Sequence, residues 1–173
     1  MIKIRDTLIK IVEKICVFLF VLITLVGLYQ VISRYFLNDP KAWSEEVLSN
    51  GFAWMALLAS ALVFGKRDHM RLTFIIDKFS LKNKKMIEII NEIIIFVFSL
   101  VIFVIGGMAI FNLTKAQITP ALQWSTGVFY LAITISGILT CIFSMANIIE
   151  IYNAKELKDL GEEVWVLWFY QAY

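Results

Sequence analysis

The chain has 173 residues, of which 60% are hydrophobic and 17% charged, with a formal net charge of +2. Its mean hydropathy of +0.80 excludes an ordinary soluble domain, and its many large apolar residues exclude intrinsic disorder. The small net charge gives no reason to expect nucleic acid as a partner. Cys16 and Cys141 both lie in apolar runs, so neither a disulfide framework nor a zinc site is expected. Most of this chain is therefore expected to lie in lipid.

Four apolar runs without ionisable residues are long enough to cross a bilayer, which takes about 20 helical residues. They cover residues 15–33, 47–65, 93–114 and 127–149. With their flanks they predict an all-α membrane protein whose transmembrane helices span 15–36, 43–65, 89–114 and 125–150. No alternating pattern typical of β-strands competes with this interpretation.

Two further segments, 1–14 and 66–86, are expected to form basic amphipathic helices that lie on the membrane surface. In the second segment, apolar residues spaced i, i+3, i+4 and i+7 share one face, while basic residues share another. Those basic residues are candidates for binding lipid headgroups, and the alternative is a solvated face that only sets topology. They are Arg71, Lys78, Lys82 and Lys85. The remainder, 151–173, is expected to be a cytoplasmic tail with an aromatic end that is assigned no role.

The basic residues also predict orientation. Of the 16 Lys and Arg side chains, only Arg34, Lys41 and Lys115 fall in the first and third loops between spans. Because Lys and Arg accumulate on the cytoplasmic side, we expect both termini and the middle loop to lie inside a bacterial inner membrane. The first span lacks a small-x-small cleavage pattern at its end, so we expect it to remain in place as an anchor.

The bare apolar runs argue against transport by this chain alone, because ions crossing hydrocarbon need polar partners at membrane depth. Enzymatic chemistry is not expected either. His69 is the sole histidine and cannot supply two haem ligands, and the two isolated cysteines cannot form the two redox pairs of a thiol oxidoreductase. The sequence therefore predicts no catalytic, cofactor-binding or metal-binding residue.

Polar residues cluster in the loop between the first two spans. Pro40 forces a turn, and Ser44 is expected to cap the second helix, with Glu45 and Glu46 in its first turn. Arg34 ends the first span at similar depth, so an ion pair with either carboxylate is geometrically available. The alternative is that these charges only mark the membrane boundary.

The second span carries a stripe of small residues that would let another helix approach closely. Trp54 follows Trp43 by eleven positions and would lie near mid-bilayer, where its indole N–H needs a partner in protein. That partner is either another helix of this chain, the favoured interpretation, or another subunit. The stripe consists of Ser49, Ala53, Ala56 and Ser60.

Together, Arg34, residues 43–46, Trp54 and the segment 65–69 with its basic sequel resemble the small membrane subunit of a tripartite ATP-independent periplasmic (TRAP) transporter. The size and four-span layout agree, and the resemblance covers residues 1 to about 155. It implies a heterodimer with a large membrane subunit that holds sodium and substrate sites. It also implies a periplasmic binding protein that delivers an organic acid, of the sialic acid or dicarboxylate type.

In such an assembly the small subunit is a non-catalytic scaffold, surrounded by phospholipid, for the elevator motion of the large subunit. The resemblance makes Arg34, Trp43, Glu45, Glu46 and Trp54 candidates for fixing the hairpin or contacting the large subunit. It makes the outer loop 119–124 a candidate contact for the binding protein. The alternative is a stand-alone four-helix protein, either a small homo-oligomeric channel or an enzyme without a recognised motif. Candidate anchors of the inner turn are Arg67, Asp68 and His69.

Overall fold

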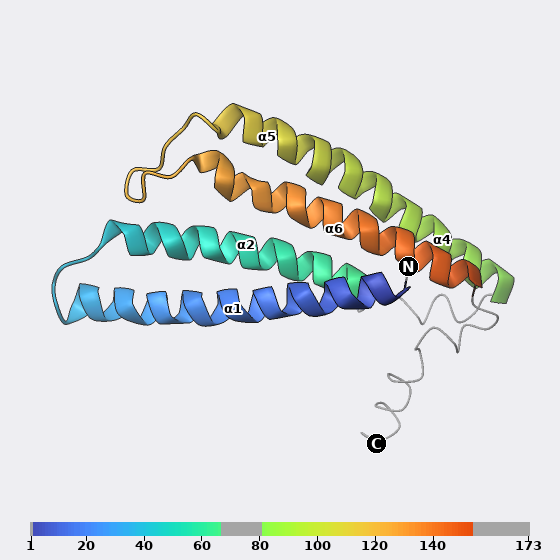
Figure 1. Ribbon diagram of the computed structural model, residues 1–173, viewed down its shortest axis with the longest axis horizontal. Coiled ribbons are helices and arrows are strands. Elements are labelled where there is room, and N and C mark those ends of the chain that lie inside the picture. The colour runs from blue at the N-terminus through green and yellow to red at the C-terminus, as the bar shows by residue number, and fades with distance from the viewer. Residues whose placement is uncertain (1, 67–80, 154–173) are drawn as a thin grey trace, which may run out of the picture.

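The computed structural model describes residues 2–66 and 81–153, which form long helices and two connecting loops (Figure 1). The helices are α1 (Ile2–Tyr35), α2 (Ala42–Lys66), α4 (Leu81–Phe98), the π-helix η1 (Ser99–Gly106), α5 (Gly107–Thr114) and α6 (Thr126–Asn153). Because α4, η1 and α5 follow one another without a break, they form a single third span. Within the described residues, four helical stretches are long and apolar enough to cross a membrane, which confirms the predicted all-α, four-span fold.

The four spans form two antiparallel hairpins that lie side by side, with α2 of the first packed against α6 of the second (Figure 1). Helix α6 is central, because it contacts α2 on one side and α4, η1 and α5 on the other. We call the end that carries loops 36–41 and 115–125 the loop end. The opposite end, where α1 begins and α6 finishes, is the terminal end.

Helix α1 runs unbroken from Ile2 to Tyr35, so the predicted surface helix 1–14 and the predicted first span 15–36 are collinear. Val12 and Ile23 are each 3% exposed, one in either part, and both contribute to the core. The third span likewise begins early, at Leu81, so residues 81–86 of the predicted middle surface helix belong to α4. In both places we predicted a boundary between a surface helix and a span where charged residues give way to apolar ones. The structure has a single continuous helix there.

Polar side chains are unusually frequent on the buried face of α6. Ser136 and Thr140, each 1% exposed, donate their hydroxyls to the carbonyl oxygens of Ile133 and Ser136 at 2.9 Å. A hydroxyl bonded to its own helix carries no unsatisfied group into the core, and its small size lets neighbouring backbones come close. Thr134, 3% exposed, differs, because its buried Oγ1 has no hydrogen-bond partner among the described residues. The buried face of α6 is thus made of small side chains, which allow helices to pack closely on both sides of it.

The π-helix keeps one face of the third span on α6. Ser99 and Gly107 are both buried, yet at about 100° per residue a regular α-helix would turn Gly107 roughly 80° away from Ser99. A π-helix turns by less per residue than an α-helix, so η1 changes this rotation, and both residues lie buried. The resulting contact is close, since a Cβ atom added to Gly107 would lie 2.6 Å from Thr134 Oγ1, and one added to Gly137 would lie 2.5 Å from Phe103 Cβ.

Candidate functional site at the two ends of the bundle

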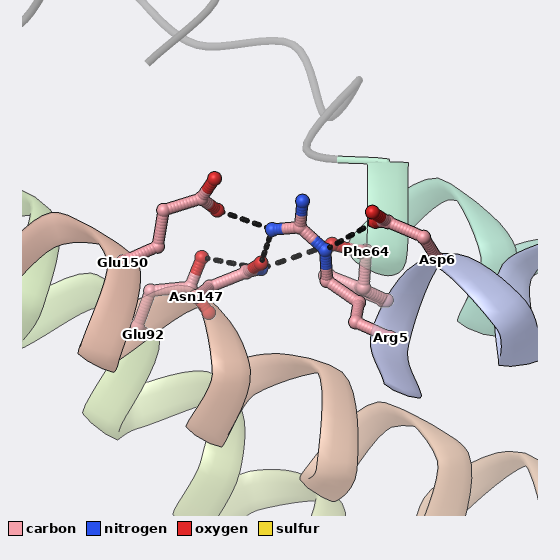
Figure 2. A network of polar contacts seen from close by, with 6 residues as sticks. All are labelled: Arg5, Asp6, Phe64, Glu92, Asn147 and Glu150. Atoms are coloured by element: carbon pink, nitrogen blue, oxygen red, sulfur yellow. Dashed lines mark hydrogen bonds and ion pairs between the residues drawn. The ribbon is translucent and has the colours of Figure 1, made fainter. Parts of the chain in front are cut away.

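The Asn147 side chain, 1% exposed, joins all four spans at the terminal end (Figure 2). Its amide nitrogen donates to the carbonyl oxygen of Phe64 on α2 and to Glu92 Oε1 on α4, both at 3.2 Å. Its amide oxygen accepts from Arg5 Nη1 on α1 at 3.3 Å. Since Asn147 itself belongs to α6, a single amide fastens the two hairpins to each other. We call this group, with Ser144 and Glu150, the Asn147 node.

Glu92 is a nearly buried carboxylate, 9% exposed, that is held by α6 through both of its oxygens. The Asn147 amide bonds Oε1, and Ser144 Oγ lies 2.9 Å from Oε2 and 2.7 Å from the Glu92 carbonyl oxygen. A buried carboxylate without such donors would be costly, and here two side chains of α6 provide them. Glu92 thus fixes the position of α4 along α6.

Arg5 brings the first turns of α1 into the node. Its guanidinium pairs with Glu150 on α6 and with the neighbouring Asp6, and its side chain is 14% exposed (Figure 2). Charge-assisted bonds in such a partly dry setting are stronger than those in water. Lys66 and Glu13 also pair, at 3.0 Å, but their side chains are 35% and 49% exposed, so that pair adds little stability.

At the loop end, Glu46 makes the corresponding link between the hairpins. Its two carboxylate oxygens accept from the backbone N–H groups of Ala121 and Leu122, each at 2.9 Å. These amides belong to the loop between α5 and α6, which is closed by a backbone bond from Thr119 N–H to the Trp124 carbonyl at 2.9 Å. We call the contact the Glu46 clip, because a carboxylate on α2 holds a loop of the other hairpin.

The first hairpin is joined by Glu45 and Trp43, two of the residues predicted as candidates for fixing it. Glu45 accepts from Gln30 Nε2 at 3.2 Å, and Trp43 stacks on Tyr29 with ring centroids 5.3 Å apart. Within the described chain, Arg34 forms no ion pair with Glu45 or Glu46. Glu45 bonds Gln30 and Glu46 bonds the loop between α5 and α6, so neither carboxylate pairs with Arg34.

The turn itself also departs from expectation. Helix α2 begins at Ala42, so Ser44 lies inside its first turn and bonds back to the Lys41 carbonyl oxygen at 2.6 Å instead of capping the helix. Lys41 pairs with Asp39, and this side-chain hydrogen bond raises the pKa of the Lys41 ammonium. Ser33, 1% exposed, donates its hydroxyl to the Asp39 carbonyl oxygen and closes the turn from α1.

Three of the four residues in the small-residue stripe of α2 are exposed. Ser49, Ala53 and Ala56 are exposed, and Ser60 and Trp54 are half-buried. The stripe is therefore open to a partner, while Trp54 lies at the edge of the bundle.

Several predicted residues lie outside the part of the chain that the structure describes. Lys82 belongs to α4, but its side chain is not described, whereas Lys85 is described and half-buried. The roles predicted for this group in lipid binding and in the inner turn stay predictions. The residues outside the described part are Arg67, Asp68, His69, Arg71 and Lys78.

Sequence reasoning missed the Asn147 node altogether. A signal was present, because Glu88 and Glu92 are spaced four apart beside an apolar run, as are Ser136 and Thr140 within another, so each pair shares a helix face. Among the described residues, no group of three or more His, Cys, Asp or Glu is placed to hold a metal. The polar groups at both ends of the bundle, the Asn147 node and the Glu46 clip, therefore join one hairpin to the other.

Comparison with known proteins decides the family. A family model described as "Tripartite ATP-independent periplasmic transporters, DctQ component" matches residues 7–153. The chain belongs to this family. Two putative TRAP transporter small permease proteins of Haemophilus influenzae are 24% and 26% identical to it, over 82% and 91% of this chain and 87% and 93% of theirs. The sialic acid TRAP transporter small permease protein SiaQ of Vibrio cholerae is 33% identical over 45% of each chain.

Membership confirms the resemblance seen in the sequence. The chain is a multi-pass inner-membrane subunit of a TRAP transporter and not an enzyme. It also implies partnership with a large membrane subunit and a periplasmic binding protein.

Proposed function

We propose that this small subunit is the scaffold of a sodium-coupled, binding-protein-dependent TRAP transporter for an organic acid. The observation that carries the proposal is the pair of fastenings at opposite ends of the bundle, the Asn147 node and the Glu46 clip. Together they tie both hairpins at both ends, which favours a bundle that moves as one body. A static support of that kind is what an elevator-type partner needs.

The hydrogen bonds of the buried polar groups also support a small subunit that serves as support while the large subunit carries the substrate. In the described part of the chain, Glu92 and Asn147 are bonded to neighbouring helices, and Ser136 and Thr140 are bonded to α6 itself. Groups already engaged in this way are poorly suited to bind a passing ion or solute. Thr134 Oγ1 is the one buried side-chain oxygen of this part without a hydrogen bond, and it lies against Gly107 with no room for a ligand. We therefore place the sodium and substrate sites in the large subunit.

The large subunit is proposed to pack against the exposed stripe of α2. Ser49, Ala53 and Ala56 are open, and neighbouring Phe52 is 53% exposed. Small residues let two helices approach closely. Close packing matters most for helix association in lipid, because lipid tails are as apolar as the side chains and the hydrophobic effect adds little.

The orientation remains the one that the basic residues favour, with both termini in the cytoplasm. It puts the Asn147 node on the cytoplasmic side and the Glu46 clip on the periplasmic side. The clipped loop presents Ile118, 68% exposed, and Trp124, 59% exposed, to the periplasm. We propose that this loop contacts the periplasmic binding protein. The basic side chains around the middle loop are proposed to meet lipid headgroups, as the sequence suggests.

The test is reconstitution. Co-expression with the large subunit is expected to give a one-to-one complex, and uptake into proteoliposomes is expected to need both membrane chains, the binding protein and a sodium gradient. Sialic acid and C4-dicarboxylates should be compared as substrates, since the name of the Vibrio cholerae relative favours the first. Uptake by this chain alone would overturn the proposal and support the stand-alone channel.

A further inference from the structure

A hollow of about 300 Å³ opens where α1 ends and α2 begins. It lies at the loop end of the bundle, where the apolar length of α1 gives way to the turn at Pro40. This position is the boundary between hydrocarbon and headgroups for a helix that spans the bilayer. The lining residues are Arg34, Pro40, Lys41, Ala42 and Glu45.

The charges around this hollow are not paired with one another. In the described residues, the Arg34 guanidinium has neither an ion-pair partner nor a hydrogen-bond partner. Glu45 accepts one hydrogen bond, from the neutral amide of Gln30. Lys41 is already paired with Asp39. Arg34 and Glu45 therefore provide a cation and a carboxylate that a ligand in this hollow could bind.

We propose that this hollow binds the headgroup of a phospholipid that carries a primary amine, with the phosphate at Arg34 and the ammonium at Glu45. A guanidinium matches a phosphate with two parallel N–H donors, and an ammonium supplies N–H donors to a carboxylate. A choline headgroup has no N–H to donate, and a glycerol headgroup has no cation for Glu45. The pairing of charges thus selects headgroups with a primary ammonium, and ethanolamine is the one that brings no further carboxylate close to Glu45.

The surroundings favour a lipid over a soluble molecule. Val31 lies one turn before Arg34 on the same side of α1 and is 52% exposed, so acyl chains can lie along the helix below the headgroup. Soluble phosphoethanolamine has the same two charges but no chains to bury. The two sources of this chemistry are therefore separable by experiment.

The experiment is native mass spectrometry of the full chain in detergent, with phosphatidylethanolamine, phosphatidylcholine and phosphatidylglycerol added in equal amounts. Wild type is expected to retain the ethanolamine lipid roughly tenfold better than either competitor, the ratio that one charge-assisted bond supports. Arg34→Gln should lose retention of all three lipids to a common low level. Glu45→Gln should keep phosphate binding and lose the discrimination between ethanolamine and choline.

Lys115→Gln is the matched control, because Lys115 is a basic residue of the other loop at the same end and does not line the hollow. It is expected to retain lipids like wild type. Equal retention of the three lipids by wild type would overturn the proposal, as would an Arg34→Gln chain with unchanged selectivity. Soluble phosphoethanolamine that binds through Arg34 and Glu45 while the lipids do not would overturn the lipid assignment.

Discussion

The Asn147 amide nitrogen on α6 lies 3.2 Å from Glu92 Oε1 on α4, and the two side chains are 1% and 9% exposed. A neutral amide and a carboxylate meet here in a nearly dry site between two membrane-spanning helices. The amide can serve the carboxylate on one side because its oxygen accepts from Arg5 on the other. The contact therefore depends on three helices being in place at once.

Replacing Asn147 with Ala should destabilise the whole bundle. The change leaves the Phe64 carbonyl and Glu92 Oε1 with fewer partners in a buried site, and each such loss costs about 1–3 kcal/mol. Thermal unfolding in detergent measures the effect. Asn112→Ala is the control, because Asn112 is an exposed asparagine on α5 whose loss should change the midpoint little. Equal midpoints for the two variants would show that the node does not hold the bundle.

The Glu46 clip predicts a local effect. Glu46→Gln replaces one acceptor oxygen with an NH₂ group that faces a backbone donor, so one of the bonds to Ala121 and Leu122 is lost. Amide hydrogen exchange in loop 115–125 should become faster, by about tenfold for the loss of one bond to a charged acceptor. Glu45→Gln should leave the exchange of this loop unchanged, since Glu45 bonds Gln30 on α1. Protection of the loop that survives Glu46→Gln would contradict the clip.

The transmembrane layout was predictable because lipid imposes it. A helix that crosses hydrocarbon needs about 20 apolar residues, and a run of that length is visible without knowledge of any neighbour. The predicted second and fourth spans, 43–65 and 125–150, correspond closely to Ala42–Lys66 and Thr126–Asn153. Only helix starts and ends, where charges extend past the hydrocarbon, were placed differently.

The partners of the polar residues were not predictable in the same way. Arg34, Glu45 and Glu46 are near one another in sequence, so local reasoning left an ion pair between them open, whereas Glu46 bonds a loop 75 residues away. The same holds for Asn147, whose partners lie on three other helices. The π-helix left no trace in the sequence either, because residues 99–106 are apolar on nearly every side and carry no periodicity to interrupt.

Replacing the adjacent residues Gly106 and Gly107 with Ala should change the free energy of unfolding in opposite directions. A Cβ atom on Gly107 would lie 2.6 Å from Thr134 Oγ1 and 3.1 Å from the Thr134 backbone nitrogen, so helices must shift, at a cost of about 1–3 kcal/mol. On Gly106 the nearest atom would be the Val101 carbonyl oxygen at 3.7 Å, an ordinary contact. Gly106→Ala should therefore gain about 0.5–1 kcal/mol from helix propensity. Unfolding midpoints that move together would argue against the close contact of η1 and α5 with α6.

The proposed interface on α2 predicts a loss of association without a loss of stability. Ala56→Leu adds bulk to an exposed stripe position, so it should weaken binding of the large subunit by roughly tenfold while the isolated chain unfolds as before. Ala109→Leu makes the same change at an exposed position of α5 and should leave association intact. Co-purification with the tagged large subunit measures both. A stronger effect at Ala109 would move the interface to the third span.

A deletion inside η1 should be better tolerated than one in the regular helix before it. Removing Ile102, which is 50% exposed, leaves seven steps from Ser99 to Gly107, and a regular α-helix then places them roughly 20° apart. The third span can thus return to α-helical geometry and still keep both residues on α6. The unfolding midpoint should stay near that of wild type.

Removing Ile94, which is 60% exposed and lies in α4, is the matched deletion. It leaves six steps between Glu92 and Ser99, which rotates these two buried residues roughly 120° out of phase, so either the Asn147 node or the packing of Ser99 must be lost. We expect a much lower unfolding midpoint and faster hydrogen exchange at the terminal end. If the Ile102 deletion proves as damaging as the Ile94 deletion, η1 does not serve to keep the third span in phase with α6.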